Sequence, residues 1–445
     1  MPKRLWSIAF AVAILTFACG GTPPAPATAG AQKNVGQVEF LSSQGQPAKE
    51  VQDMNTKVLA GFNGTVDFQS QPTGAQDIDK VLSQHQAGKS TIDVLALQHG
   101  DFTTLAAADA LEDLTPLLQK LQKDRKFPAQ LLNYGKFGSQ KQYYIPWLQA
   151  TYLMVVNKKA LQYLPKGSDV NNLSYEQLIS WGQAVEKAKG EKLIGLPVAP
   201  GTKGGLMNRF LQGYAYPSYT GQTLVGFKSP DAVQMWQMLK RLWSVTNAQS
   251  TTYAYMQEPL QNGEVWIAWD HQARFADALN KLGDQFTVIP APSGPKGLGY
   301  MSVAVGLAIP KGAPNRAGAE ALIDYLTQAK QQAAAGSSLS FFPVIDGVNL
   351  TGSDVPSYLS AESAVASKYV ANKKSVITLL PVGLGAKGDE FTLTYQDAFT
   401  RIILRNEDIQ TVLNDDAAKL QQLVTTAKAA CWPPDPPSSG PCQIR

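Results

Sequence analysis

Short apolar runs that alternate with helical patterns are the feature that most restricts the fold of this 445-residue chain. Residues 38–42, 65–69 and 92–97 have the β-branched and aromatic content of strands. Helix-like stretches follow the first two runs, at residues 48–62 and 77–86. This alternation predicts an α/β fold with largely parallel sheets. Ligands of such sheets bind outside the carboxyl ends of the strands, so the loops after the strands are candidate site positions.

The alternation continues through the second half of the chain. Ser174 and Gln177 have the spacing of a capping box and predict a helix that ends near Lys189. The other predicted elements are strands at 151–157, 265–269, 286–290 and 303–309, and helices at 233–245 and 315–329.

The N-terminus has the pattern of an export signal. Lys3 and Arg4 precede an apolar run over residues 5–18, which is shorter than the roughly 20 residues of a permanent membrane span. Residues 15–19, Leu-Thr-Phe-Ala-Cys, resemble the lipobox of bacterial lipoproteins, in which the cysteine is diacylated. The alternative is an ordinary secretory signal that is cleaved nearby. We therefore expect a lipoprotein signal peptide over 1–19 with lipidation at Cys19, and a flexible tether over 20–34.

The other two cysteines, Cys431 and Cys442, lie in a Pro-rich tail at residues 429–445. An exported chain meets oxidising surroundings, so this pair predicts one local disulfide, with metal binding as the weaker alternative. With all three cysteines assigned, we expect neither a metal site nor a cofactor.

Charge and motif content exclude several function classes. The 39 basic and 35 acidic residues give a formal charge of +4 without a basic stripe, so we expect no nucleic-acid partner. Residues 383–388 match Gly-x-Gly-x-x-Gly formally, but no βαβ unit follows them. We interpret this segment as a cleft loop that leads into a helix carrying Tyr395.

Several weak motifs occur in an order that is similar to a known family. These are Ile92-Asp93-Val94-Leu95, Tyr144-Ile145-Pro146 before residues 152–158, residues 262–269 and the Pro/Gly segment 290–297. Together they resemble the extracellular solute-binding proteins of ABC importers, in the group that includes maltose-binding protein.

The resemblance implies a type II periplasmic-binding-protein fold, in which two α/β lobes are joined by a multi-crossing hinge. Lobe 1 would take residues 35–146 and 305–341, lobe 2 residues 151–300 and 345–428, and the hinge residues 147–150, 301–304 and 342–344. It also implies a non-enzymatic, monomeric receptor that is extracytoplasmic, lipid-anchored to the bacterial cell membrane and partnered by an ABC permease.

A sugar site needs aromatic planes and side chains that both donate and accept hydrogen bonds. The predicted strand ends offer such a set, which carries few net charges and fits an uncharged carbohydrate, expected to be an oligosaccharide. The candidate ligand-binding residues are Ser43, Gln44, His99, Asp101, Trp147, Gln149, Trp269, Asp270, His271, Arg274, Tyr300, Glu390 and Tyr395.

Other interpretations of these residues stay open. Asp101 is also placed to cap a helix, and Asp270 with Arg274 has the spacing of a helical ion pair. Trp266 and Trp269 are three residues apart, so at most one of them faces a cleft. The alternative functions are a receptor for a polyamine or a phosphate ester, or an exported glycoside hydrolase that uses Asp101 and Asp270 as paired carboxylates.

Overall fold

The computed structural model describes residues 34–45, 48–71, 74–201, 204–348, 350 and 355–445. The predicted signal peptide, Cys19 and all but the last residue of the tether lie outside the described residues. Residues 35–445 form one compact unit. Among the described helices, none combines the length and the apolar content that crossing a membrane requires.

The larger sheet of the described chain has seven strands, in the order β10-β4-β9-β3-β1-β2 with β11 paired to β9. They are β1 (Gln37–Ser42), β2 (Thr65–Ser70), β3 (Val94–Gln98), β4 (Ile145–Ala150), β9 (Leu298–Ala308), β10 (Phe342–Pro343) and β11 (Ser375–Leu379). β1 is parallel to β2 and β3, as predicted for the first strands. β9 is antiparallel to β3 and β4, so the sheet is mixed.

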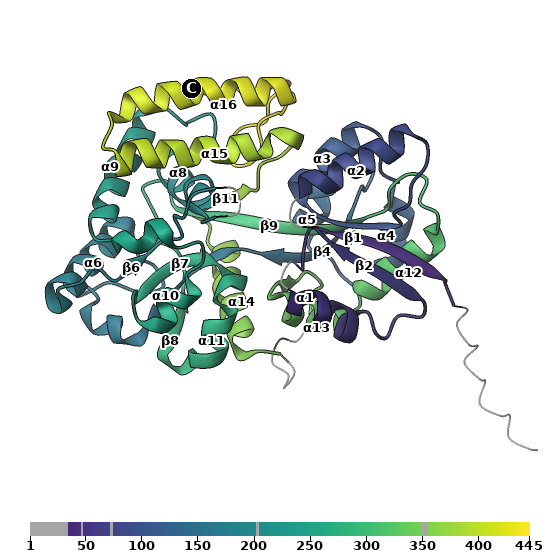
Figure 1. Ribbon diagram of the computed structural model, residues 1–445, viewed down its shortest axis with the longest axis horizontal. Coiled ribbons are helices and arrows are strands. Elements are labelled where there is room, and N and C mark those ends of the chain that lie inside the picture. The colour runs from purple at the N-terminus through teal and green to yellow at the C-terminus, as the bar shows by residue number, and fades with distance from the viewer. Residues whose placement is uncertain (1–33, 46–47, 72–73, 202–203, 349, 351–354) are drawn as a thin grey trace, which may run out of the picture. The chain divides into compact units, whose positions relative to one another are not determined.

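Both faces of this sheet are covered. In β3, Val94 and Ala96 belong to one hydrophobic core, whereas Leu95 and Leu97 belong to another. Successive side chains of a strand point to opposite faces, so the run is apolar throughout because each face packs on helices. Figure 1 shows these helices, which are α2 (Gly74–Gln86) and α3 (His99–Ala107) on one face, and α12 (Arg316–Leu326) and α13 (Ala329–Leu339) on the other.

The smaller sheet has four strands in the described chain, in the order β6-β7-β5-β8. They are β5 (Tyr152–Asn157), β6 (Ile194–Gly195), β7 (Ile267–His271) and β8 (Phe286–Ile289). All six residues of β5 are buried, because β5 lies inside the sheet and carries helices on its faces. The helices of this part of the chain are α6 (Tyr175–Lys189), α7 (Met207–Phe210), α8 (Tyr216–Thr220), α9 (Pro230–Ser244), α10 (Gln257–Asn262) and α11 (Ala276–Leu282).

Thr151 is the single residue between β4 of the larger sheet and β5 of the smaller one. Its backbone N–H donates to Gln272 Oε1 at 3.0 Å. Its hydroxyl donates to the Met301 carbonyl at 3.0 Å and lies 3.0 Å from the Tyr214 hydroxyl. This buried network ties β4, β5 and β9 together where the chain passes from one sheet to the other.

The helix and strand predictions hold with three notable differences. The predicted helix 48–62 is the short helix α1 (Ala48–Asp53) followed by a π-helical turn over Met54–Val58, and residues 59–62 are not helical. The capping box is confirmed, since Ser174 Oγ accepts from the Gln177 N–H at 3.2 Å and Gln177 Oε1 from the Ser174 N–H at 2.9 Å. The predicted helix 315–329 is α12, which ends at Leu326, and a second helix, α13, follows it from Ala329, because the backbone of Gln328 is extended (φ −70°, ψ 147°). The predicted strand 303–309 starts at Leu298 as β9.

The remaining α-helices are α1 (Ala48–Asp53), α4 (Thr115–Leu121), α5 (Ala129–Tyr134), α14 (Ser357–Ala371), α15 (Gly388–Phe399) and α16 (Ile409–Ala427). The last two are long helices near the C-terminal end of the chain. α15 and α16 lie side by side in Figure 1.

The C-terminal tail contains the predicted disulfide and is also hydrogen-bonded to a distant part of the chain. A disulfide joins Cys431 and Cys442, whose Cα atoms are 4.5 Å apart. Between them, the buried Asp435 carboxylate accepts backbone N–H bonds from Thr223 at 3.1 Å, Leu224 at 2.9 Å and Val225 at 2.7 Å. The tail is therefore a clamp between α16 and the loop that follows α8.

Candidate functional site

A cavity of about 1050 Å³ lies at the strand ends, where the α/β pattern predicts a site. Ser43 and Gln44 follow β1, Gln98 ends β3, Tyr152 begins β5 and His271 ends β7. The rest of its wall includes Lys49, Asp53, Lys57, Arg209, Tyr255, Gln257, Arg274, Asp277, Ser337, Ser338, Phe341 and Tyr358. Its volume is at the upper end of the roughly 300–1000 Å³ that is usual for small-molecule sites.

A second cavity of about 230 Å³ shares part of this wall. Ser43, Gln98 and Arg209 line both cavities, and Asp101 lines only the smaller one. The opposite wall is the predicted cleft loop, with Gly385 and Gly388 among its lining residues.

Gly100 lets that loop approach α3. A Cβ atom at this position would lie 2.0 Å from the Pro381 carbonyl oxygen, so a larger residue would push the two segments apart. Close backbone approach of this kind requires glycine.

Tyr152 forms the apolar corner of the larger cavity. Its ring stacks on Trp269 with centroids 5.2 Å apart and an interplanar angle of 8°, and it meets His271 edge-on at 5.1 Å. Trp269 is only 1% exposed. Of this stacked pair, Tyr152, which is 4% exposed, is the residue that lines the cavity, and Trp269 packs behind it.

Arg274 and Tyr255 form a second amphipathic part of the wall. The guanidinium carbon of Arg274 lies 4.2 Å from the centroid of the Tyr255 ring, and Nη1 donates to the Ala254 carbonyl at 2.7 Å. The Asp270 carboxylate is 3.8 Å from Nη1, which is the predicted four-residue ion pair. Tyr255 remains 49% exposed, so its ring is available to a bound molecule.

Burial sets the protonation of several groups around the cavities. Burial raises the pKa of Asp101 to about 6, against the opposing effects of a backbone hydrogen bond at Gln98 and of Arg209. Burial also raises the pKa of Asp270 to about 6. Burial, with Arg274 and Arg209 nearby, lowers the pKa of His271 to about 3, so this imidazole is neutral at physiological pH.

Five of the predicted site residues line the two cavities. Ser43, Gln44, His271 and Arg274 line the larger cavity, and Asp101 lines the smaller one. These residues all follow or end predicted strands, which is the property that singled them out.

The other predicted site residues lie elsewhere in the described structure. His99, Trp147, Trp269, Asp270, Tyr300 and Tyr395 are buried in the core. Gln149 lies half-buried in β4, and Glu390 is exposed on α15 in an ion pair with Lys387 at 3.0 Å.

Hydrogen bonds explain the position of the buried polar members. His99 Nδ1 is 3.0 Å from the Tyr144 hydroxyl. Asp270 accepts from the N–H groups of Met256 at 2.9 Å and His271 at 2.7 Å. Asp270 lies behind the wall of the larger cavity, whereas Asp101 lines the smaller one.

Sequence patterns did not single out several wall residues. Arg209 and Tyr255 come from short irregular stretches around α7 and α10, where no strand end is predicted. Tyr358 lies at the start of α14. Tyr152 is the one missed wall residue that the sequence could have indicated. It lies on a strand that pairs with the strand of Trp269, and aromatic side chains on two paired strands often stack.

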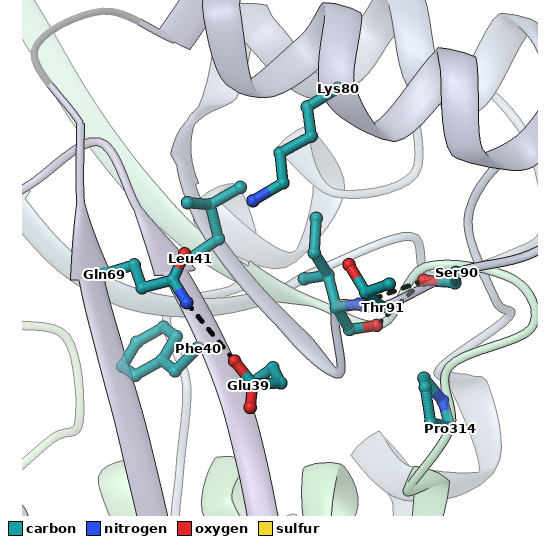
Figure 2. A pocket seen from close by; sticks show the side chains of 9 residues that line it. Glu39, Phe40, Leu41, Gln69, Lys80, Ser90, Thr91 and Pro314 are labelled. Atoms are coloured by element: carbon teal, nitrogen blue, oxygen red, sulfur yellow. Dashed lines mark hydrogen bonds between the residues drawn. The ribbon is translucent and has the colours of Figure 1, made fainter.

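A separate pocket of about 280 Å³ lies beside β1, away from the strand ends that form the larger cavity. Figure 2 shows the Lys80 ammonium reaching toward it, and the Gln69 side chain bonded to Glu39 at 3.3 Å. With Glu39 already engaged and Phe40 as its one aromatic ring, this pocket matches sugar recognition less well than the large cavity does. Across the described residues, no three His, Cys, Asp or Glu side chains are grouped to hold a metal ion.

Comparison with solved structures reveals similar folds. The GacH receptor of Streptomyces glaucescens, solved unliganded and with acarbose, has 17% identity and a TM-score of 0.67, covering 87% of this chain and 98% of its own. Maltose-bound MalE3 of T. maritima has 18% identity and a TM-score of 0.68, covering 87% and 100%. UgpB of Mycobacterium tuberculosis, in complex with glycerophosphocholine, has 17% identity and a TM-score of 0.65, covering 87% and 98%.

These similarities confirm the type II periplasmic-binding-protein fold. A search of curated proteins by sequence found no match. The family profile of bacterial extracellular solute-binding proteins matches residues 49–333, which is more than half of the chain. The chain therefore belongs to the family of bacterial extracellular solute-binding proteins.

Proposed function

We propose that this solute-binding protein captures a carbohydrate, in particular an oligosaccharide, in the large cavity and delivers it to the permease of an ABC importer. The observation that carries the proposal is the wall of the cavity, which combines the exposed ring of Tyr255 and the lining residue Tyr152 with the polar side chains of Ser43, Gln44 and Ser337. Ser337 lines the cavity, and among the described residues its buried Oγ has no hydrogen-bond partner.

Delivery would follow from closure of two lobes around the solute, with the predicted boundaries 35–146 plus 305–341 and 151–300 plus 345–428. The Thr151 network supports a hinge at 147–150, 301–304 and 342–344, because it joins the strands that run between the two sheets. Lipidation of Cys19 would hold the receptor at the outer surface of the cell membrane, as a monomer beside its permease.

A polyamine receptor is less well supported. A polycation needs unpaired carboxylates, but Asp53 is paired with Lys49 at 2.5 Å and Lys57 at 3.0 Å. Arg209 and Arg274 add positive charge to the same wall.

A thermal-shift screen tests the proposal. Neutral and acidic oligosaccharides are compared with spermidine and short peptides, and a ligand at 100 times its Kd should stabilise the fold by about 2.7 kcal/mol. We expect a saccharide to raise the Tm. If spermidine or a peptide stabilises the protein while no saccharide does, the carbohydrate proposal is wrong.

Replacing Tyr255 with alanine should weaken saccharide binding by about tenfold while leaving the fold nearly as stable, because the ring is a half-exposed contact surface. Isothermal titration with the saccharide found in the screen measures the loss. Val370→Ala is the matched control, since Val370 is 56% exposed on α14 and is not a lining residue of the cavity. Equal affinities of the two variants would remove Tyr255 from the site.

A further inference from the structure

Arg209 lies at the junction of the two cavities and lines both. Its Nη1 donates to Gln212 Oε1 at 3.2 Å. No carboxylate of the described residues lies within ion-pair distance of its guanidinium group. A guanidinium group carries five N–H donors in a planar fork, so most of its hydrogen-bonding capacity remains for a ligand.

No described carboxylate that lines the two cavities forms an ion pair with Arg209, and this includes Glu50 of the larger cavity and Asp389 of the smaller one. Asp53 is held by two lysines, and Asp277 pairs with Lys281 at 2.8 Å. Asp270 is fully buried behind the wall on two backbone N–H groups. Asp101 faces Arg209 only across the smaller cavity, beyond ion-pair distance.

A second guanidinium group lies in the same wall. Arg274 is fixed over Tyr255 and keeps only a 3.8 Å contact with Asp270. Both arginines act on His271, whose pKa they lower together with burial. Arg209, Arg274 and His271 thus all line the large cavity.

We propose that the solute carries an anionic substituent, a carboxylate or a phosphate, which Arg209 binds with Arg274 beside it. The inference rests on the proposed function, because it places this substituent on the carbohydrate in the large cavity. A planar guanidinium group matches two oxygens of a carboxylate or a phosphate, which gives a short, charge-assisted pair of hydrogen bonds.

Matched saccharides that differ in charge test the inference by isothermal titration. Digalacturonate is compared with its dimethyl ester for the carboxylate, and maltose 6′-phosphate with maltose for the phosphate. We expect the anionic member of one pair to bind roughly tenfold to hundredfold more tightly, with the preference falling as salt is added. The pair that shows the preference identifies the anionic group.

Arg209→Met should abolish that preference, and Arg209→Lys should retain part of it. Arg241→Met is the control, because Arg241 pairs with Glu176 on the surface. Circular dichroism checks the fold, which the Arg209→Met protein should keep. Stabilisation by inorganic phosphate, measured at constant ionic strength, gives an independent readout. The Arg209→Met protein should lose this stabilisation, and the control variant should retain it.

Two results would overturn the inference. If both members of each pair bind alike and Arg209→Met weakens them equally, Arg209 and Asp101 recognise neutral hydroxyl groups, and the carbohydrate function stands. If no saccharide of either charge binds, the proposed function fails with it.

Discussion

Replacing Asp435 with alanine should lower the free energy of unfolding by about 3–5 kcal/mol, because three buried backbone N–H groups would lose a charged acceptor. The carboxylate is 4% exposed, so water does not replace it readily. Equilibrium denaturation in guanidinium chloride measures the change.

Asp415→Ala is the control for this prediction. Asp415 is half-exposed on α16 and pairs with Arg401 at 2.9 Å, and an exposed ion pair of this kind contributes at most about 1 kcal/mol. Losses of similar size in the two variants would show that the clamp does not stabilise the fold.

Replacing Glu362 with glutamine should change how stability depends on pH. Glu362 is fully buried in α14, and neither carboxyl oxygen has a hydrogen-bond partner among the residues that the structure describes. Burial raises its pKa well above the usual value, so the folded protein holds a proton that the unfolded chain releases. The stability of the native protein should therefore fall by about 1.4 kcal/mol for each pH unit between the unfolded and folded pKa values.

The glutamine side chain does not titrate, so the stability of the variant should lack this dependence on pH. Denaturation at pH 5, 6 and 7 compares the two proteins, and the variant should gain relative stability as the pH rises. Glu258→Gln, on the exposed surface of α10, serves as the control and should follow the native profile. Parallel profiles for the Glu362 variant would contradict the prediction.

The fold was largely predictable, because alternating strands and helices follow from local pattern. Ser174 and Gln177 mark the start of α6 through two adjacent hydrogen bonds, which depend on neighbours in the chain. Helix α13 was not predictable in the same way, since its first turn, Ala-Lys-Gln-Gln, carries no apolar periodicity.

The site was predictable only where it follows strand ends. Ser43 and His271 come directly after or at the end of such runs, and both line the cavity. Trp147 and Trp269 occupy strands that are buried on both faces, so alternation does not tell which side chain faces a cavity. Arg209 enters the wall through tertiary packing alone, and no spacing in the sequence signals it.

Strand β9 has a consequence for how the chain folds during synthesis. Its C-terminal half pairs with β3, so Leu95 is joined to Ala308, and the same strand also pairs with β4 and β11. A chain that leaves the ribosome from its N-terminus thus cannot join β3 to β4 through β9 until Ala308 has been made, and the larger sheet is complete only after β11, which ends at Leu379. The Asp435 clamp, which reaches back to Thr223, forms later still, because its two sides are 212 positions apart in the chain.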